Sequence, residues 1–373
     1  MTEQECLLIL TGVAGLGNIR IRKLIECFGS AKRVLSISSS ELAAEGVIPA
    51  SVVHHIVRFE KDKYLKEEED QIKRHGVVIV SFQDEDYPEN LCHIPDSPVI
   101  LYVKGTLKKE NNLAIAIVGS RRASIYGVSI AEKFAMGLSE LGITIVSGMA
   151  RGIDSAAHRG ALRAKGSTVA VLGNGLSTIY PPENKKLFEE IVESGAVVSE
   201  FPMATPPLAH NFPRRNRIVS GLALGVVIAE ASHKSGALIT SRFALEQGRE
   251  VFAVPGKVDS INAQGVNNLI KQGAKLISGI EDILEELTPQ LKYRLELAKE
   301  DNMAKSSVGR DFIASRLTDE EANIYNRIRE EAIYIDDVAY QSGLTAAQAM
   351  NVLLKLELKH LVRQLPGKLF VRT

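Results

Sequence analysis

The sequence predicts an α/β protein whose central domain is a doubly wound parallel sheet, and two observations carry this prediction. Short apolar runs alternate with helical patterns between residues 113 and 277, and each run ends in glycine or a polar residue. The run from Leu113 to Val118 contains no polar side chain, which is typical of a strand buried on both faces. Alternating strands and helices of this kind favour a parallel sheet with helices on both faces.

The length and composition of the chain limit what this protein can be. A chain of 373 residues suggests two or three domains. The formal net charge is zero, so any cationic site must be local. Cys6, Cys27 and Cys92 are too far apart for a metal or disulfide framework and fit a reducing cytoplasm. No run of about 18 apolar residues occurs, so we expect no membrane span and a cytoplasmic protein.

Residues 1–75 are expected to form a helical domain of the helix-hairpin-helix or SAM-like kind. The turn Gly15-Leu16-Gly17 precedes an amphipathic helix, and the stretch Glu45–Ile56 has the same sequence pattern. In a helix-hairpin-helix, a glycine turn of this kind offers backbone N–H groups to a DNA phosphate. The alternative is a small helical bundle that only packs.

Residues 76–287 are expected to form the sheet domain. Two strands, Val77–Phe82 and Val99–Lys104, are predicted ahead of the main series. The main series is predicted at Ala114–Val118, Ile143–Ser147, Thr168–Leu172, Ala196–Ser199, Val226–Ala229, Glu250–Val254 and Lys275–Ile277, with helices starting near Val128, Ile153, Glu183, Ala237 and Asn267.

The C-terminal part of the chain is expected to contain a linker, residues 288–316, and a winged helix, residues 317–373. The linker is charged and breaks the alternation. Three helical patterns then precede the stretch Leu361–Arg372, whose central Pro366-Gly367 is typical of a β-hairpin. The third helical pattern carries no arginine, so contact with a protein is as consistent with this unit as contact with a DNA groove.

The candidate functional residues begin in the turn after the first central strand. Gly119-Ser120-Arg121-Arg122 follow that strand directly, and an amphipathic helix comes next. Such a turn presents backbone N–H groups to an anion, and two arginines favour a phosphate ligand. The spacing is not G-x-G-x-x-G, so the dinucleotide fingerprint is absent. The alternative is a surface loop with two solvated arginines.

Glycines also follow the next two predicted strands. Gly148 and Gly152 come after the second central strand, and Gly173 comes after the third. Glycines at these places allow either a close approach of the backbone to a ligand or tight turns alone. Asp154 and His158 stand one helical turn apart, so they form either an acid–base pair or, more simply, a capping aspartate and a packing histidine.

The stretch His210–Gly225 is the most informative part of the sequence. It interleaves one aromatic residue with guanidinium groups, and we predict that these residues lie on a loop. That arrangement suits a single strand, whose bases stack on aromatic rings and whose phosphates need cations. The alternative is that the aromatic ring is core and that the arginines pair with Glu200 or Glu230. The residues concerned are Phe212, Arg214, Arg215 and Arg217.

A second anion site is expected at Ser235-Gly236, which open a helix directly after a strand. Ser235 is a candidate N-cap, because its hydroxyl can accept a hydrogen bond from the first helical turn. The remaining free N–H groups of that turn would then face an anion.

Taken together, these motifs resemble the DprA (Smf) family of DNA-processing proteins. GSRRASIYG, SGMARGIDSAAHRGAL, LGNGLSTIYPPEN, FPRRNRIVSGL, EASHKSGALIT and AVPG occur in this order between about Asp86 and Leu284. The resemblance implies an extended Rossmann-like domain, a homodimer, and binding of single-stranded DNA onto which the RecA recombinase is loaded in natural transformation, with protection of that strand. It implies no catalytic activity, and we expect no cofactor and no metal.

The resemblance also implies roles for particular residues. The DNA-contacting arginine of the family falls on Arg121. His210 stands close to the position where some members of the family carry a lysine. The family's basic and aromatic run falls on Phe212, Arg214, Arg215 and Arg217. The residues that would shape the same pocket are Gly119, Ser120, Gly148, Gly152, Gly173 and Ser235, and no catalytic residue is assigned.

The leading hypothesis is therefore a recombination mediator that binds single-stranded DNA. The rival is an enzyme acting on a nucleotide phosphoester or glycosidic bond with Glu200, Glu230 or Asp154 as its base, and a nucleotide-sensing scaffold is a third alternative. A carboxylate facing the Ser235-Gly236 anion site would favour the enzyme. The sequence leaves open the strand order, the dimer surface, the recombinase contact, the ligand of the winged helix, and the choice between transformation and other recombination.

Overall fold

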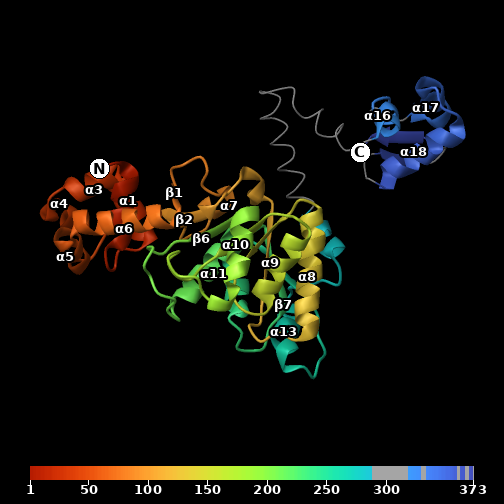
Figure 1. Ribbon diagram of the computed structural model, residues 1–373. Helices are drawn as coiled ribbons and strands as arrows, with labels where there is room; N and C mark the ends of the chain where they lie inside the picture. Colours follow the sequence, from red (N-terminus) through yellow and green to blue (C-terminus); the bar gives the residue numbers. More distant parts are fainter. Residues whose placement is uncertain (288–317, 329–332, 359–361, 366–368, 373) are drawn as a thin grey trace. The chain divides into compact units, whose positions relative to one another are not determined.

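The computed structural model describes residues 1–287, 318–328, 333–358, 362–365 and 369–372. The chain divides into two compact units, Met1–Thr288 and Pro289–Thr373 (Figure 1). The predicted linker, residues 288–316, lies outside the described residues. Of the helices in the described ranges, none is both long and apolar enough to cross a lipid bilayer.

The first unit begins with a helical bundle, which confirms the prediction that residues 1–75 are helical. The glycine turn after its first helix lies against the helix Ala50–Arg58, because His55 Nδ1 donates a hydrogen bond to the carbonyl of Ala14 at 3.0 Å. Its helices are α1 (Glu3–Gly12), α2 (Asn18–Phe28), α3 (Ala31–Ser36), α4 (Ser39–Ala44), α5 (Ala50–Arg58) and α6 (Lys61–His75).

In the described part of this unit, nine strands form one sheet in the order β1-β2-β6-β5-β4-β3-β7-β8-β9. β2 pairs antiparallel with both β1 and β6, whereas all neighbours from β6 to β9 are parallel. The strands are β1 (Val78–Ser81), β2 (Ile100–Gly105), β3 (Ala114–Gly119), β4 (Thr144–Ser147), β5 (Thr168–Val171), β6 (Ala196–Ser199), β7 (Gly225–Glu230), β8 (Glu250–Ala253) and β9 (Lys275–Leu276).

The parallel part of the sheet is doubly wound, as predicted. The chain moves from β3 to β6 in one direction and then returns to place β7 on the other side of β3. Ligands of such sheets bind at the carboxyl ends of the strands where the winding direction reverses, which here lies between β3 and β7. The connecting helices are α7 (Glu89–Cys92), α8 (Ile125–Glu140), α9 (Ile153–Arg163), α10 (Lys185–Ser194), α11 (Asn211–Gly221), α12 (Ala237–Glu246) and α13 (Gln264–Lys271), with short 3₁₀ turns η1 (Lys109–Asn112), η2 (Pro182–Asn184) and η3 (Ile261–Ala263).

The strand predictions are confirmed to within one residue at each end. The reason is burial on both faces: the side chains of β3 from Ala114 to Val118 are all buried, as are those of β4, β5 and β6. A strand covered on both sides must be apolar along its length, so its sequence has no alternation. This pattern is the easiest one to read from a sequence.

Several helices begin away from the predicted residues. α13 begins at Gln264, three residues before the predicted Asn267, and α10 begins at Lys185, two residues after the predicted Glu183. α8 begins at Ile125, three residues before the predicted Val128, because the Ser124 hydroxyl caps it by accepting a hydrogen bond from the Gly127 N–H at 3.0 Å. The prediction of a loop at the basic and aromatic run is wrong, since Asn211–Gly221 form α11. Pro213 lies in the first turn of α11, where a missing N–H costs nothing, so the proline does not prevent the helix.

The helical bundle and the sheet share one hydrophobic core. Leu7, Leu24 and Val52 of the bundle belong to the same cluster of buried side chains as Tyr102 and Phe188 of the sheet domain. The predicted boundary near residue 75 falls between α6 and β1, inside the first compact unit. The division of this unit into two domains stays a prediction.

The second unit has the fold of a winged helix, as predicted. Buried Ile324, Val338, Leu353 and Phe370 contribute to its core. A short strand that was not predicted, β10, pairs with the hairpin in the order β10-β12-β11. The turn at Pro366-Gly367 lies outside the described residues. The elements are α16 (Asp319–Tyr325), β10 (Ile333–Tyr334), α17 (Ile335–Ser342), α18 (Ala346–Leu358), β11 (Val362–Leu365) and β12 (Leu369–Arg372).

Candidate functional site

A pocket of about 730 Å³ opens at the carboxyl edge of the sheet, at the point where the winding direction reverses; we call it the switch pocket. The loop after β3 and the loop after β7 form opposite parts of its wall, and the loop after β4, the loop after β8 and helix α11 complete it. The position is the one that the topology of a doubly wound sheet assigns to a ligand. Candidate residues from four separate sequence motifs therefore meet in one place.

The loop after β3 is held rigidly by its neighbours, and it presents Arg121 to the pocket. The Ser120 N–H donates to the carbonyl of Glu230 at 2.8 Å, and the Ser120 carbonyl accepts from the Ile153 N–H at 3.2 Å. Arg121 itself is exposed, and its guanidinium carbon lies 4.9 Å from the centre of the Phe212 ring. This is a cation–π contact, so the structure brings together the predicted arginine and the predicted aromatic residue.

Helix α11 divides the basic and aromatic run between two faces. Phe212, Arg215, Asn216 and Val219 line the switch pocket, and their spacing of three, four and seven residues places them on one side of the helix. We call this side the pocket face. The Phe212 ring also lies 5.7 Å from the ring of Tyr180, measured between centroids. The pocket face thus supplies a half-buried aromatic surface.

The opposite side of α11, which we call the anchoring face, carries the other two predicted arginines away from the pocket. Arg217 is 5% exposed and forms ion pairs with Glu200 and, at 3.0 Å between Nε and Oδ2, with Asp96. Asn18 of α2 donates to the same Glu200 carboxylate at 3.0 Å. Arg214 is exposed and lies 3.9 Å from Glu200. Neither Arg214 nor Arg217 lines the switch pocket.

A buried charged pair forms the floor of the pocket. Arg215 is 3% exposed and donates to the carbonyl of Val171, while its Nε has no hydrogen-bond partner. Burial lowers the pKa of Arg215 to about 10, although the nearby Asp154 carboxylate acts in the other direction. Burial likewise raises the pKa of Asp154, against the effect of Arg215. Each group limits the cost of burying the other.

The predicted glycines are explained by what lies against them. A Cβ at Gly148 would collide with the Arg215 guanidinium, and one at Gly173 would lie 2.9 Å from Cδ1 of Phe212. Gly152 has a left-handed φ of +75°, and a side chain there would strike the backbone of the loop after β3. Gly148 and Gly173 make room for the pocket face of α11, and Gly152 lets its loop approach the loop after β3. Of these three glycines, Gly148 lines the switch pocket and the other two do not. The glycines therefore affect the ligand site indirectly, by leaving room for neighbouring groups of the protein itself.

The loop after β7 brings the start of α12 to the pocket. Ser235, Gly236 and Ala237 line it. The Ser235 hydroxyl accepts a hydrogen bond from the Ala237 N–H at 3.3 Å, although Gly236 rather than Ser235 is the N-cap residue. A helix start with few capping groups directs N–H groups and a partial positive charge at an anion. Arg121 stands in the same pocket, so two sources of positive potential converge there.

The three carboxylates that an enzyme would use as a base are all engaged within the protein. Glu230 accepts from the Ser124 N–H at 3.0 Å and from its hydroxyl. Glu200 is buried between Arg217 and Asn18, outside the pocket lining. Asp154 does line the pocket, but it is buried and accepts a hydrogen bond from the Ala150 N–H at 3.4 Å.

Sequence reasoning missed several residues of the switch pocket, among them Tyr180 and Asn216. Tyr180 follows β5 and stands beside Phe212, and Asn216 lies on the pocket face of α11. Tyr180 belongs to the motif LGNGLSTIYPPEN, so an aromatic residue in a strand-end loop was the available signal. For Asn216 the signal was helical spacing from Phe212, which a loop assignment concealed.

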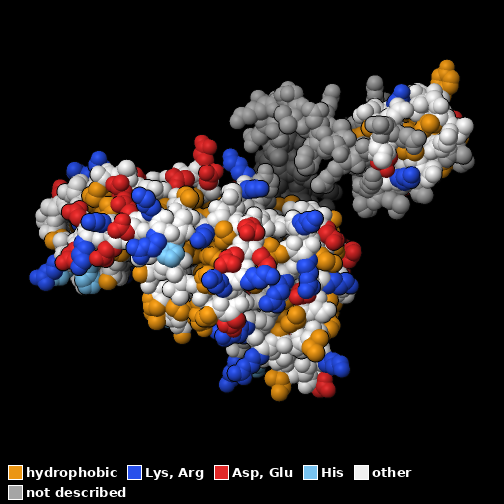
Figure 2. Space-filling model, in the orientation of Figure 1, with side chains coloured by type: hydrophobic (Ala, Val, Ile, Leu, Met, Phe, Trp, Pro, Cys, Tyr) orange, Lys and Arg blue, Asp and Glu red, His pale blue; other side chains and the backbone are white. Residues whose placement is uncertain are grey.

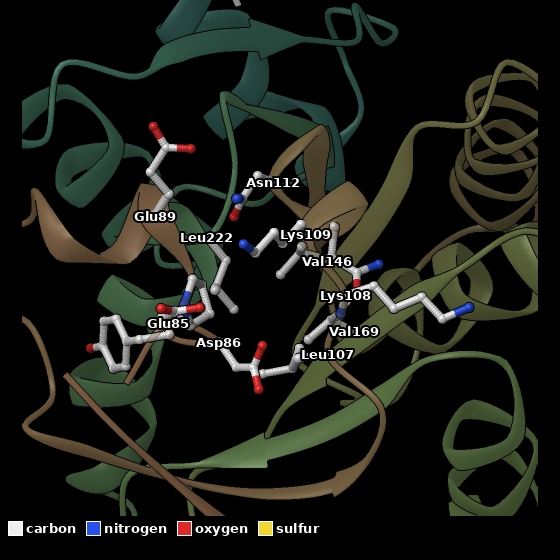
Figure 3. Close-up of a pocket in the computed structure, with 13 residues that line it drawn as sticks. Glu85, Asp86, Glu89, Leu107, Lys108, Lys109, Asn112, Val146, Val169 and Leu222 are labelled. Carbon is white, nitrogen blue, oxygen red and sulfur yellow. Dashed lines mark hydrogen bonds between the residues drawn. The ribbon is translucent and has the colours of Figure 1, made fainter. Parts of the chain in front are cut away.

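A different hollow of about 240 Å³ lies at the opposite, amino edge of the parallel strands (Figure 3). Asn112 precedes β3 and Leu222 precedes β7, which fixes its position. Figure 3 shows Asp86 and Lys109 reaching toward the hollow from two loops. Its charges are of mixed sign, unlike the converging cations of the switch pocket. Figure 2 likewise shows basic and acidic side chains interspersed on the visible face of the first unit.

The fold and the pocket define a class of protein: a doubly wound α/β protein with an aromatic and cationic pocket where the winding direction reverses. The family profile described as DNA recombination-mediator protein A matches residues 78–288, and that of the DprA winged helix domain matches residues 311–368. The chain therefore belongs to the DprA family of DNA recombination-mediator proteins, as the sequence motifs indicated.

Individual relatives agree with this assignment. Protein Smf of Escherichia coli is 42% identical over 290 residues, which are 78% of this chain and 76% of that protein. DNA processing protein DprA of Streptococcus pneumoniae is 45% identical over 206 residues, 55% of this chain and 73% of that one.

Two solved structures are similar to this one. The crystal structure of DprA from Streptococcus pneumoniae has a TM-score of 0.67 at 37% identity, covering 77% of this chain and 98% of that one. DNA processing protein A from Helicobacter pylori, whose structure concerns its binding of single-stranded DNA, has a TM-score of 0.52 at 29% identity, covering 58% and 98%.

Proposed function

We propose that this protein binds single-stranded DNA at the switch pocket. The observation that carries the proposal is the placement of Arg121 against the Phe212 ring in the pocket where α12 begins. A nucleotide needs both a cation or N–H groups for its phosphate and a flat surface for its base, and here they are neighbours. In a duplex the bases are already stacked, so only an unpaired base can use the flat surface.

In this proposal the phosphate lies between Arg121 and the N–H groups at the start of α12. The base stacks on the flat surface made by the Arg121 guanidinium and the Phe212 ring, with Tyr180 alongside. Arg215 and Asp154 hold the floor below. Gly119, Ser120, Gly148, Gly152 and Gly173 keep the walls in place, and Ser235 contributes to the second anion site.

The roles of the two arginines on the anchoring face differ from those expected from the sequence. We assign Arg217 to structure, because it is buried between Glu200 and Asp96. Arg214 can reach a phosphate only outside the pocket. We therefore propose Arg121, Phe212 and Arg215 as the central residues of the site.

The finer functional statements follow from family membership rather than from the site. We propose that the protein is a recombination mediator without catalytic activity, that it acts as a homodimer, and that it loads the RecA recombinase onto single-stranded DNA and protects that DNA in natural transformation. The engagement of Glu200 and Glu230 within the protein supports a binding role over an enzymatic one. The loading step is tested by measuring how much RecA co-sediments with single-stranded DNA in the presence and in the absence of this protein.

The binding proposal is tested by fluorescence anisotropy of a labelled dT oligonucleotide across a salt series, with duplex DNA as competitor. We expect tight binding that salt weakens, that duplex competes with poorly, and that Arg121→Glu abolishes. Absence of binding by the unaltered protein at low salt would overturn the proposal. Nucleoside monophosphates would then be screened for turnover, because the rival enzyme would need such a substrate.

A further inference from the structure

Exposed apolar side chains occur on two segments of chain that adjoin residues lining the switch pocket. Ile125 and Tyr126, at the start of α8, are 91% and 56% exposed. Val258 and Ile261, between β8 and α13, are 91% and 70% exposed. We call these four residues the apolar rim. Side chains of this size are seldom left exposed together without a partner that covers them.

A second hollow of about 550 Å³ opens next to this rim. Tyr126, Val254, Pro255 and Lys257 contribute to its lining. Its lining is mainly apolar and also includes Lys257. Among the described residues, Lys257 has no ion-pair partner.

The second hollow adjoins the switch pocket, because the same two segments of chain line both. Ile261 and Asn262 line the switch pocket, whereas Ser260 and Ala263, their neighbours in the chain, line the second hollow. The loop after β3 does the same, since its arginines line one hollow and Ser124 and Tyr126 line the other. The Asn262 side chain donates to the carbonyl of Arg122 at 3.4 Å, which joins the two loops between the hollows.

The charges around the second hollow suit a polyanion. Two cations, Arg122 and Lys257, and one carboxylate, Asp259, are exposed on the segments that line it. The carboxylate within it, Glu230, is buried and already accepts hydrogen bonds from Ser124. An occupant therefore meets apolar and aromatic surface inside and positive charge at the edge. Unpaired bases joined by phosphates have this combination.

We propose that the second hollow is a second base-binding subsite, which takes a nucleotide adjacent in the strand to the one in the switch pocket. This inference rests on the proposed function. The base lies against Tyr126 and the apolar rim, and its phosphate lies between Arg122 and Lys257. The rim also disfavours a duplex, because a duplex offers charged backbone rather than unpaired bases to these exposed apolar side chains.

The test is a comparison of oligonucleotide lengths with the full chain. Labelled dT ligands of increasing length, from the mononucleotide upward, are titrated by anisotropy against the unaltered protein, Tyr126→Ala and Tyr126→Phe. We expect Tyr126→Ala to leave binding of the mononucleotide unchanged and to weaken binding of dT2 and longer strands by roughly fivefold or more, the effect of losing one stacked base. Tyr126→Phe keeps the ring and should bind all lengths normally.

A matched control is Leu245→Ala, which removes another exposed apolar side chain, 64% exposed on α12, outside both hollows. It should not alter binding at any length. A thermal melt of each variant checks folding, and Val258→Ser provides a second removal of the rim should Tyr126→Ala be unstable. A further strand carries 5-iododeoxyuridine next to its 5′ or its 3′ terminal dT. Photo-cross-linking of this strand should label the peptide that contains Tyr126.

The outcomes separate the inference from the proposed function. Binding of long strands by Tyr126→Ala and Val258→Ser at the affinity of the unaltered protein would overturn the second subsite while leaving the switch pocket intact. An equal loss for the mononucleotide and for long strands would also overturn it, because Tyr126 would then belong to the first subsite. Failure of the unaltered protein to bind any strand would instead overturn the proposed function itself.

Discussion

The two faces of α11 both carry arginine, but one face lines the switch pocket and the other anchors the helix to the rest of the protein. On the pocket face, Phe212 and Arg215 look into an open pocket, with Arg121 above the ring. On the anchoring face, Arg217 is enclosed by Glu200 and Asp96 and ties the helix to Asn18 of the N-terminal bundle. Three arginines within four residues of sequence thus have three environments.

The comparison shows that the number of arginines in a basic stretch of sequence does not equal the number of phosphate contacts. A guanidinium that is already paired with carboxylates has no charge left for a ligand, and removing Arg217 leaves the Glu200 carboxylate buried without this charge partner. A guanidinium above an aromatic ring at the mouth of a pocket remains available. The difference comes from the 3.6-residue turn of the helix, which sends neighbours in the sequence to opposite sides.

The largest expected effect is on folding stability, from the anchoring face. Arg217→Ala should lower the free energy of unfolding by about 3–5 kcal/mol, because Glu200 would stay buried without its charge partner. Urea denaturation followed by circular dichroism measures this. Arg214→Ala is the matched control and should change stability by less than about 1 kcal/mol, since Arg214 is exposed. Equal effects of the two substitutions would remove the distinction between the faces.

The next effect concerns His158, whose pKa is influenced by Arg215, the buried cation of the pocket face. Burial, reinforced by the charge of Arg215, lowers the pKa of His158 to about 3. The folded protein therefore keeps His158 neutral while the unfolded chain binds a proton below about pH 6.5. Stability from this residue is complete above that pH and is lost as the pH falls toward 3. At pH 5 the loss should be about 2 kcal/mol.

Denaturation curves between pH 5 and pH 7.5 check this dependence. His158→Asn cannot titrate in this range, so its stability should vary less with pH than that of the unaltered protein. Parallel pH profiles for the two proteins would contradict the assignment. The comparison of slopes is informative even if the substitution lowers stability at every pH.

On the pocket face, substitution should act on binding rather than on folding. Phe212→Ala should weaken the binding of a dT oligonucleotide by at least fivefold, the lower end of roughly 1–3 kcal/mol for one stacked base. Phe212→Tyr retains an aromatic face and should bind nearly as the unaltered protein does. Anisotropy titration gives both affinities. Unchanged affinity for Phe212→Ala would place the base elsewhere.

The smallest effect is on the salt dependence of binding. Arg121→Ala should reduce the slope of log K against log salt by about 0.7, the contribution of one phosphate of a single strand. Arg217 is enclosed by carboxylates, so a folded Arg217→Lys variant should keep the full slope. A slope unchanged in Arg121→Ala would remove Arg121 from the phosphate contacts, and a reduced slope in Arg217→Lys would return Arg217 to them.

Much of the fold could be predicted because strands that are buried on both faces have a simple apolar pattern in the sequence. β3 to β8 are covered on both faces, so they read as apolar runs that end in glycine or polar residues. The motifs at their ends also predicted where a ligand would lie, since parallel strands bring their carboxyl ends to one edge. The strand order could not be read, because the pairing of β2 with β6 joins segments far apart in the chain.

The sequence by itself determined the alternation of strands and helices, the family, and the set of candidate residues around Arg121 and Phe212. Only the tertiary structure decided which of those residues share the pocket. Whether an arginine stays available depends on which side of α11 it occupies and on whether Glu200, Asp96 or open space lies opposite. Those neighbours come from distant parts of the chain, so no local pattern could have specified them.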